Sequence, residues 1–218
     1  MKYKNRKDAG LKLAFGLRQL IKEDCIVCAI PRGGVPVAFE VAASLHFPMQ
    51  LVLAKKIGHP ANKEYAIGAA SLNGYFVWAD EQVSDAYVAE EVERIQTRLR
   101  EMEHTFGAGR KQFALKQKTL LVIDDGVATG NTILATIQLL RKEEPLKIIV
   151  AVPVASSQAY RQLQKEADEI ICLQIAEELN AVGSFYEDFS QVTDEEVTAC
   201  LDEMENMYQH NLQPEKTV

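Results

Sequence analysis

Two adjacent carboxylates, Asp124 and Asp125, follow an apolar run in this chain of 218 residues. The run, residues 120–123, predicts a buried β-strand that delivers both acids to its carboxyl end. Neighbouring carboxylates can each accept a hydrogen bond from one of two vicinal hydroxyl groups, or supply oxygen ligands to a metal ion. The pair therefore predicts a site for a diol or a metal.

The segment after the acid pair is suited to binding an anion. Residues 126–132, Gly-Val-Ala-Thr-Gly-Asn-Thr, lead into a predicted helix. Small residues let backbone N–H groups converge on a ligand, the helix N-terminus adds partial positive charge, and the hydroxyls of Thr129 and Thr132 can donate to phosphate oxygens. The motif is neither a Walker A loop nor a dinucleotide fingerprint. A diol site beside a phosphate site predicts a ribose 5-phosphate as the ligand.

A second anion site is predicted at residues 31–34, Pro-Arg-Gly-Gly, between a predicted strand and a predicted helix. Arg32 offers a planar fork of donors that matches phosphate oxygens. Lys55 and Lys56 end the next predicted strand, and residues 25–63 carry a net charge of +3 in a chain whose net charge is −7. This local positive charge favours a polyanionic ligand.

Alternating strands and helices position these residues. Continuous runs of Val, Ile and Leu between helices indicate parallel strands covered on both faces. We therefore expect an α/β fold with a doubly wound, open parallel sheet, in which ligands bind outside the carboxyl ends of the strands. The predicted strands are 25–30, 49–54, 119–124, 147–154 and 169–175, and the predicted helices are 8–21, 36–46, 85–106, 131–142 and 157–167.

Apolar spacing predicts the buried faces of two of these helices. The helix 85–106 has an apolar stripe with alternating spacings of four and three, which indicates either a packing face or the seam of a dimer. In the first helix Asp8 is the expected N-cap, and the expected apolar positions are Leu11, Phe15, Leu17 and Leu20.

Residues 57–79 are less regular than the segments on either side. Gly, Pro and Asn mark a loop at their beginning, and the short apolar runs 66–70 and 75–78 flank Asn73 and Gly74. This arrangement predicts a β-hairpin.

The segment Asp-Asp-Gly-Val-Ala-Thr-Gly-Asn-Thr, with its preceding strand and following helix, resembles the phosphoribosyl pyrophosphate (PRPP) signature of type I phosphoribosyltransferases. The resemblance implies a Rossmann-like core with a flap at about 57–79. It also implies Mg²⁺-dependent transfer of the phosphoribosyl group from PRPP to a nitrogenous acceptor, with a nucleobase as the expected acceptor, and release of pyrophosphate. Mg²⁺ would be held mainly by PRPP, with no direct protein ligand.

The resemblance also implies a role for each matching residue. Asp124 and Asp125 would bind the ribose hydroxyls. The 5-phosphate would lie on Ala128, Thr129, Gly130, Asn131 and Thr132, and the pyrophosphate on Arg32, Gly33, Gly34, Lys55 and Lys56. In this family a cis peptide bond turns an N–H group of the pyrophosphate loop toward the ligand, so we expect one between Arg32 and Gly33 in at least some states of the protein.

The chain further resembles a subfamily of predicted phosphoribosyltransferases whose acceptor is unassigned, through IPRGGVPVA, KKIG, AIGA and VGSFYEDFSQVTDEEV. We expect a single domain over 1–218, with a small hood formed by the N-terminal helix and about 176–200, and an acidic tail at about 201–218. In the hood, the candidates to stack on a flat acceptor are Phe185, Tyr186 and Phe189, and Asp188 is a candidate to accept from its amino group. The alternative is that these aromatic residues form a small core for the hood.

Composition limits the other classes of function. With 47% hydrophobic and 25% charged residues the chain is typical of a globular protein, and no apolar run approaches the ~18 residues of a membrane helix. Residues 187–218 carry a net charge of −8 and the rest +1, which argues against a nucleic-acid partner. Cys25 and Cys28 are expected on opposite faces of one strand, so they would not share a metal. We expect a cytoplasmic protein without a membrane segment.

Other interpretations of the chain remain open. The same fold serves non-catalytic regulators that sense PRPP, and Asp124 in isolation is also compatible with the phosphoryl acceptor of a receiver or phosphatase domain. The apolar stripe on the helix 85–106 leaves a homodimer possible.

Overall fold

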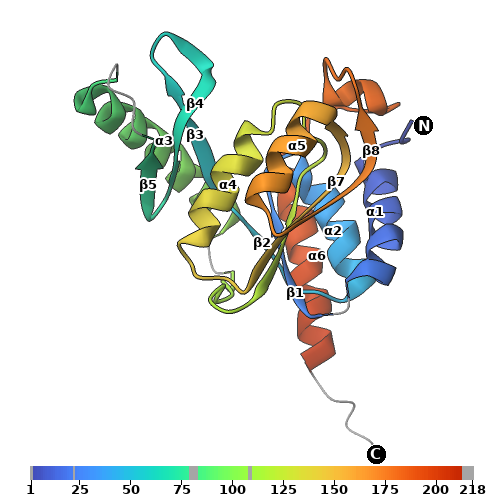
Figure 1. Cartoon of the computed structure of the whole chain (residues 1–218). Helices are drawn as coiled ribbons and strands as arrows, with labels where there is room; N and C mark the ends of the chain where they lie inside the picture. The colour runs from blue at the N-terminus through green and yellow to red at the C-terminus, as the bar shows by residue number, and fades with distance from the viewer. Residues whose placement is uncertain (1, 22, 79–82, 108–109, 213–218) are drawn as a thin grey trace, which may run out of the picture.

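A parallel sheet of five strands forms the centre of the computed structural model, which describes residues 2–21, 23–78, 83–107 and 110–212 (Figure 1). The strand order is β2-β1-β6-β7-β8. All residues of β1 and β6 are buried because helices cover both faces of the sheet. The strands are β1 (Cys25–Ala29), β2 (Met49–Leu51), β6 (Thr119–Ile123), β7 (Lys147–Ser156) and β8 (Glu169–Ala176).

Two layers of helices enclose this sheet. One face packs against α1 (Arg6–Leu20), α2 (Gly34–Leu45) and α6 (Asp194–Leu212), and the other against α4 (Asn131–Arg141) and α5 (Ser157–Glu166). Alternate residues of each strand enter opposite layers, so Cys25 belongs to the first core and Cys28 to the second. The predicted doubly wound sheet and the opposite orientation of the two cysteines are confirmed.

A smaller antiparallel sheet lies beside the central one. It consists of β3 (Ala54–His59), β4 (Asn62–Ser71) and β5 (Gly74–Val77), and the register Ser71↔Gly74 confirms the predicted hairpin. The prediction for the preceding strand was wrong at its end: β2 stops at Leu51, and Lys55 and Lys56 lie within β3. A turn to a new direction after Leu51 places both lysines in the second sheet.

The helix α3 (Asp85–Phe106) has the predicted bounds and packs on this second sheet. Its residues Val92, Ile95 and Leu99 share one core with Ile57 and Ile67 of β3 and β4. The apolar stripe is therefore a packing face within one chain and not a dimer seam. We call β3, β4, β5 and α3 together the flap unit.

The first helix differs from its prediction in its N-cap residue and in the face that it buries. Asn5, not Asp8, is the N-cap, since the Asn5 side chain accepts a hydrogen bond from the Asp8 N–H. Gly10 packs so closely on α2 that a Cβ there would lie 2.8 Å from the Val37 carbonyl oxygen. This contact turns Leu13, Ala14 and Leu17 inward and leaves Leu11, Phe15 and Leu20 46%, 75% and 58% exposed.

The N-terminus and the segment after β8 pack together. Tyr3 pairs with Tyr186 in a parallel bridge, and the Tyr3 N–H donates to the Phe185 carbonyl beside a short 3₁₀ helix, η1 (Val182–Phe185). The chain then enters α6, which covers much of the stretch expected to be a tail; Leu201 and Met204 of this helix are buried in the main core. Among the described residues, no helix has the length and apolar character needed to cross a membrane.

Candidate functional site

The acid pair lies at the carboxyl end of β6, at the bottom of a cleft between the central sheet and the flap unit. The Asp125 N–H donates to Asp124 Oδ1 at 2.8 Å. Burial raises the pKa of Asp124 well above its ordinary value, and the neighbouring Asp125 charge raises it further. Burial also raises the pKa of Asp125, against the opposing effect of Arg6. The site thus holds two crowded carboxylates that a diol or a cation would stabilise.

Arg6, which belongs to none of the predicted motifs, neutralises the charge of Asp125. Its Nε lies 2.8 Å from Asp125 Oδ2, and its guanidinium carbon lies 3.9 Å from the centroid of the Phe189 ring. Arg6 also donates to the Ser190 carbonyl at 2.7 Å. No local pattern could reveal this residue, because it is separated from Asp125 by 119 positions in the sequence.

The predicted phosphate loop joins β6 to α4. Gly130 is the N-cap of α4 with φ 81°, a left-handed conformation that favours glycine, and no side chain caps the helix. Thr129 and Thr132 are exposed, and the Ser156 hydroxyl fixes the loop by donating to the Ala128 carbonyl at 2.7 Å. The loop therefore leaves N–H and hydroxyl donors open to an anion.

The Pro-Arg-Gly-Gly loop between β1 and α2 lies against the acid pair. A Cβ on Gly33 would fall 2.1 Å from Asp125 Oδ2, and one on Gly34 would fall 2.8 Å from the Ile123 carbonyl oxygen. Glycine is thus required at both positions for this close approach. In this structure the cis peptide bond of the loop lies between Pro31 and Arg32, one position before the bond for which it was predicted.

Both lysines of β3 line the flap side of the cleft. Lys55 and Lys56 border a hollow of about 420 Å³ together with Asp124 and Thr132. Lys55 also borders the adjoining hollow of about 510 Å³, on the side of the hood. Burial lowers the pKa of Lys55, and the charge of Arg98 lowers it further. The second sheet thus brings the lysines back to the strand ends of the first.

The structure separates three of the four candidate acceptor residues, Phe185, Tyr186 and Asp188, from the cleft's lining. Tyr186 is 3% exposed and packs with Tyr3, and Phe185 packs against the same cluster. Asp188 is exposed and accepts from the Ser190 N–H at 2.9 Å. Phe189 lines the hollow on the hood side instead. This placement favours the alternative interpretation of Phe185 and Tyr186, as a small core of the hood.

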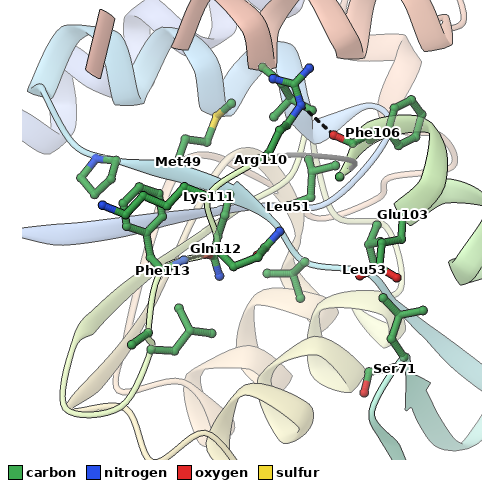
Figure 2. A pocket seen from close by; sticks show the side chains of 18 of the residues that line it. Met49, Leu51, Leu53, Ser71, Glu103, Phe106, Arg110, Lys111, Gln112 and Phe113 are labelled. Atoms are coloured by element: carbon green, nitrogen blue, oxygen red, sulfur yellow. Dashed lines mark hydrogen bonds between the residues drawn. The ribbon is translucent and has the colours of Figure 1, made fainter. Parts of the chain in front are cut away.

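A further cavity of about 490 Å³ lies along the free edge of β2 (Figure 2). It is mostly apolar and shares only Leu53 and Ala54 with the lining of the flap-side hollow. Figure 2 shows Arg110 turned away toward α6, where it pairs with Asp202, while its Nε donates to the Phe106 carbonyl. None of the predicted site residues lines this cavity.

The fold and the site define a class of protein, the type I phosphoribosyltransferases. The family model described as "Phosphoribosyl transferase domain" matches residues 2–189. The chain belongs to this family, which confirms the resemblance found in its sequence.

Two named proteins are similar over nearly the whole chain. "Putative phosphoribosyl transferase Rv0571c" of Mycobacterium tuberculosis (strain ATCC 25618 / H37Rv) is 38% identical over 205 residues, which are 92% of this chain and 46% of that protein. The chain thus spans about half the length of this relative. The crystal structure of TT1426 from Thermus thermophilus is 37% identical with a TM-score of 0.87, covering 94% of this chain and 99% of that one.

Proposed function

We propose that this chain transfers the 5-phosphoribosyl group of PRPP to a nitrogen atom of a nucleobase and releases pyrophosphate. One observation carries the proposal: the acid pair, the phosphate loop and the Arg32 loop meet at neighbouring strand ends of a family member. Their chemistry matches the diol, the 5-phosphate and the diphosphate of a single PRPP molecule. The names of the relatives support the same reaction class.

Each binding role follows from the donors or acceptors available. Asp124 and Asp125 accept hydrogen bonds from the two ribose hydroxyls, while residues 128–132 donate to the 5-phosphate. Arg32, the glycines beside it and Lys55 receive the pyrophosphate. Lys56 adds positive charge from the same strand.

The chain's own groups would assist the reaction mainly by positioning and by charge. The acceptor nitrogen forms a bond to C1 of the ribose while the bond from C1 to the pyrophosphate oxygen breaks. That bond's electron pair leaves with pyrophosphate, and the acceptor loses its N–H proton to solvent. Cations around the leaving group stabilise the charge that develops on it, and closure of the flap keeps water from the cationic ribose.

Mg²⁺ fits the site because Asp124 and Asp125 are hard oxygen donors, and burial raises the pKa values of both, so that a cation would stabilise their ionised forms. Asp124 and Asp125 would hold the ion through the ribose hydroxyls or water, and bound Mg²⁺ supplies charge neutralisation for the diphosphate. We place the reaction in the cytoplasm, in keeping with the four unpaired cysteine thiols.

The experiment is a continuous assay of pyrophosphate release from Mg–PRPP across a panel of purine and pyrimidine bases. The wild type is expected to turn over with at least one base, and the double variant D124N/D125N to be inactive and not to bind PRPP in calorimetry, with an unchanged circular dichroism spectrum. PRPP binding without pyrophosphate release from any base would instead support the PRPP-sensing regulator. Equal PRPP affinity of the variant and the wild type would overturn the assignment of the acid pair.

A further inference from the structure

Arg98 lies at the centre of the cleft, although it belongs to no motif of the sequence. It lines the hood-side hollow with Arg6 and Asp125, and the flap-side hollow with Lys55 and Thr132. It also lines a third hollow of about 520 Å³, together with Arg32 and Asp194. A side chain on α3 therefore borders all three hollows.

Most cations around the cleft already have an acidic partner. Arg6 pairs with Asp125, Arg32 with Asp194 at the start of α6, and Arg94 with Glu91.

Lys55 and Arg98 differ from these cations. Within the part of the chain that the structure describes, no carboxylate pairs with either of them. Lys55 is half-buried and lies within the electrostatic reach of Arg98 and Arg32, so like charges face one another there. Such an arrangement is unfavourable until an anion with more than one charge enters.

We propose that Arg98 and Lys55 form a diphosphate subsite, in which α3 and β3 bind the pyrophosphate group of PRPP opposite the Arg32 loop. The inference rests on the proposed function and extends it to a residue outside the family's motif. The guanidinium fork can bind two phosphate oxygens at once, while the lysine supplies a point charge. A diphosphate, with its two adjacent anionic groups, fits this pair of cations.

The position of Arg98 also links the ligand to the flap unit. Its neighbours Ile95 and Leu99 pack against Ile57 and Ile67 of the second sheet, while Phe106 at the end of the same helix is buried in the main core. Figure 1 shows α3 beside β3, β4 and β5 at one side of the molecule. A diphosphate held between Arg98 and the Arg32 loop therefore connects the flap unit to the central sheet.

The test compares three probes by isothermal titration: Mg–PRPP, pyrophosphate and ribose 5-phosphate. R98A is expected to weaken binding of PRPP and pyrophosphate about 10- to 100-fold, because a group that makes charge-assisted hydrogen bonds is lost. Its affinity for ribose 5-phosphate is expected to stay unchanged, because that ligand lacks the diphosphate. R98K is expected to restore part of the loss. R100A is the matched control, since Arg100 is exposed on the same helix and lines none of the three hollows.

The outcomes separate this inference from the proposed function. Unchanged pyrophosphate and PRPP affinity in R98A would overturn the subsite and leave the proposed function standing. An equal loss of affinity for ribose 5-phosphate would also overturn the subsite, since Arg98 would then attract any anion and not the diphosphate in particular. A wild type that binds pyrophosphate through Arg98 but not PRPP would support the subsite and overturn the proposed function. A wild type that does not bind pyrophosphate at all would overturn the subsite.

Discussion

The two carboxylates at the end of β6 are buried side by side, an arrangement that disfavours their ionised forms. Burial and the charge of Asp125 both raise the pKa of Asp124. Arg6 neutralises Asp125, but no cation pairs with Asp124 among the described residues. Unfavourable crowding of this kind is typical of binding sites, whose residues are selected for the bound state.

We predict that D124N raises the melting temperature at pH 7 while it removes PRPP binding. An acid whose pKa is raised by folding destabilises the native state above its unfolded pKa near 4, because the unfolded chain ionises it more readily. Stability is therefore lost as the pH rises from about 4 through the native pKa. The gain of D124N over the wild type should shrink as the pH falls toward 4. Each kcal/mol gained in the free energy of unfolding raises the melting temperature by about 2–4 °C.

Calorimetric scans of both proteins between pH 4 and pH 8 measure this difference. D125N serves as the comparison, since the same change there leaves Arg6 without its carboxylate partner and should stabilise less. A D124N protein that melts below the wild type at pH 7 would contradict the account.

At the scale of elements, the flap unit is better ordered than its sequence predicts. Glycine, proline and asparagine indicate a loop, yet β3 and β4 form an antiparallel ladder, with register shifts around Gly58, and bury Ile57 and Ile67 against α3. The tip, residues 59–65, has no buried side chain among its described residues, and neither does β5. The base of the flap thus has a core of its own, and closure involves the tip or a movement of the unit as a whole.

We predict two classes of amide exchange within the flap. Peptides covering Ile57 and residues 67–70 should exchange slowly without ligand, since their amides lie in a packed sheet. Peptides covering the tip should exchange rapidly and become protected when Mg–PRPP and an acceptor are both bound. Hydrogen exchange read by mass spectrometry distinguishes the two, with the fully buried strand β6 as the protected reference. Strong protection of the tip in the free protein would rule out a closing flap.

At the scale of the whole molecule, α6 completes the main core. Val197, Leu201 and Met204 enter the core formed by α1, α2 and one face of the sheet. Several acidic residues around them, among them Glu195, Glu196 and Glu203, are exposed, and their charge alone indicated a tail. Asp194 also joins α6 to the site by pairing with Arg32, so the helix contributes to both stability and the cleft.

We predict that L201A lowers the free energy of unfolding by about 2–5 kcal/mol, the usual result of removing a buried leucine side chain. The exposed E203A on the same helix is the control and should change it by no more than about 0.5 kcal/mol. Urea denaturation followed by circular dichroism measures both. Equal stability of L201A and the wild type would mean that α6 does not pack on the core in solution.

The sequence by itself determined the features that depend on neighbouring residues. The apolar run before Asp124 specifies a buried strand, the small residues after it specify a turn into a helix N-terminus, and the stripe on α3 specifies a helix with one buried face. These signals are local, because backbone conformation and periodic burial are read over a few residues.

Only the tertiary structure decided which distant side chains meet. Arg6, Arg98 and Asp194 come from three helices, and each resembles any other exposed charge when its neighbours alone are considered. The tertiary structure also decides which face of α1 is buried, because Gly10 packs closely on α2. It likewise decides the place of Lys55 in the cleft, which depends on where β2 ends. Parallel strands bring their carboxyl ends to one edge, so residues far apart in sequence converge there. Their contacts follow from packing across the whole chain, which no local pattern encodes.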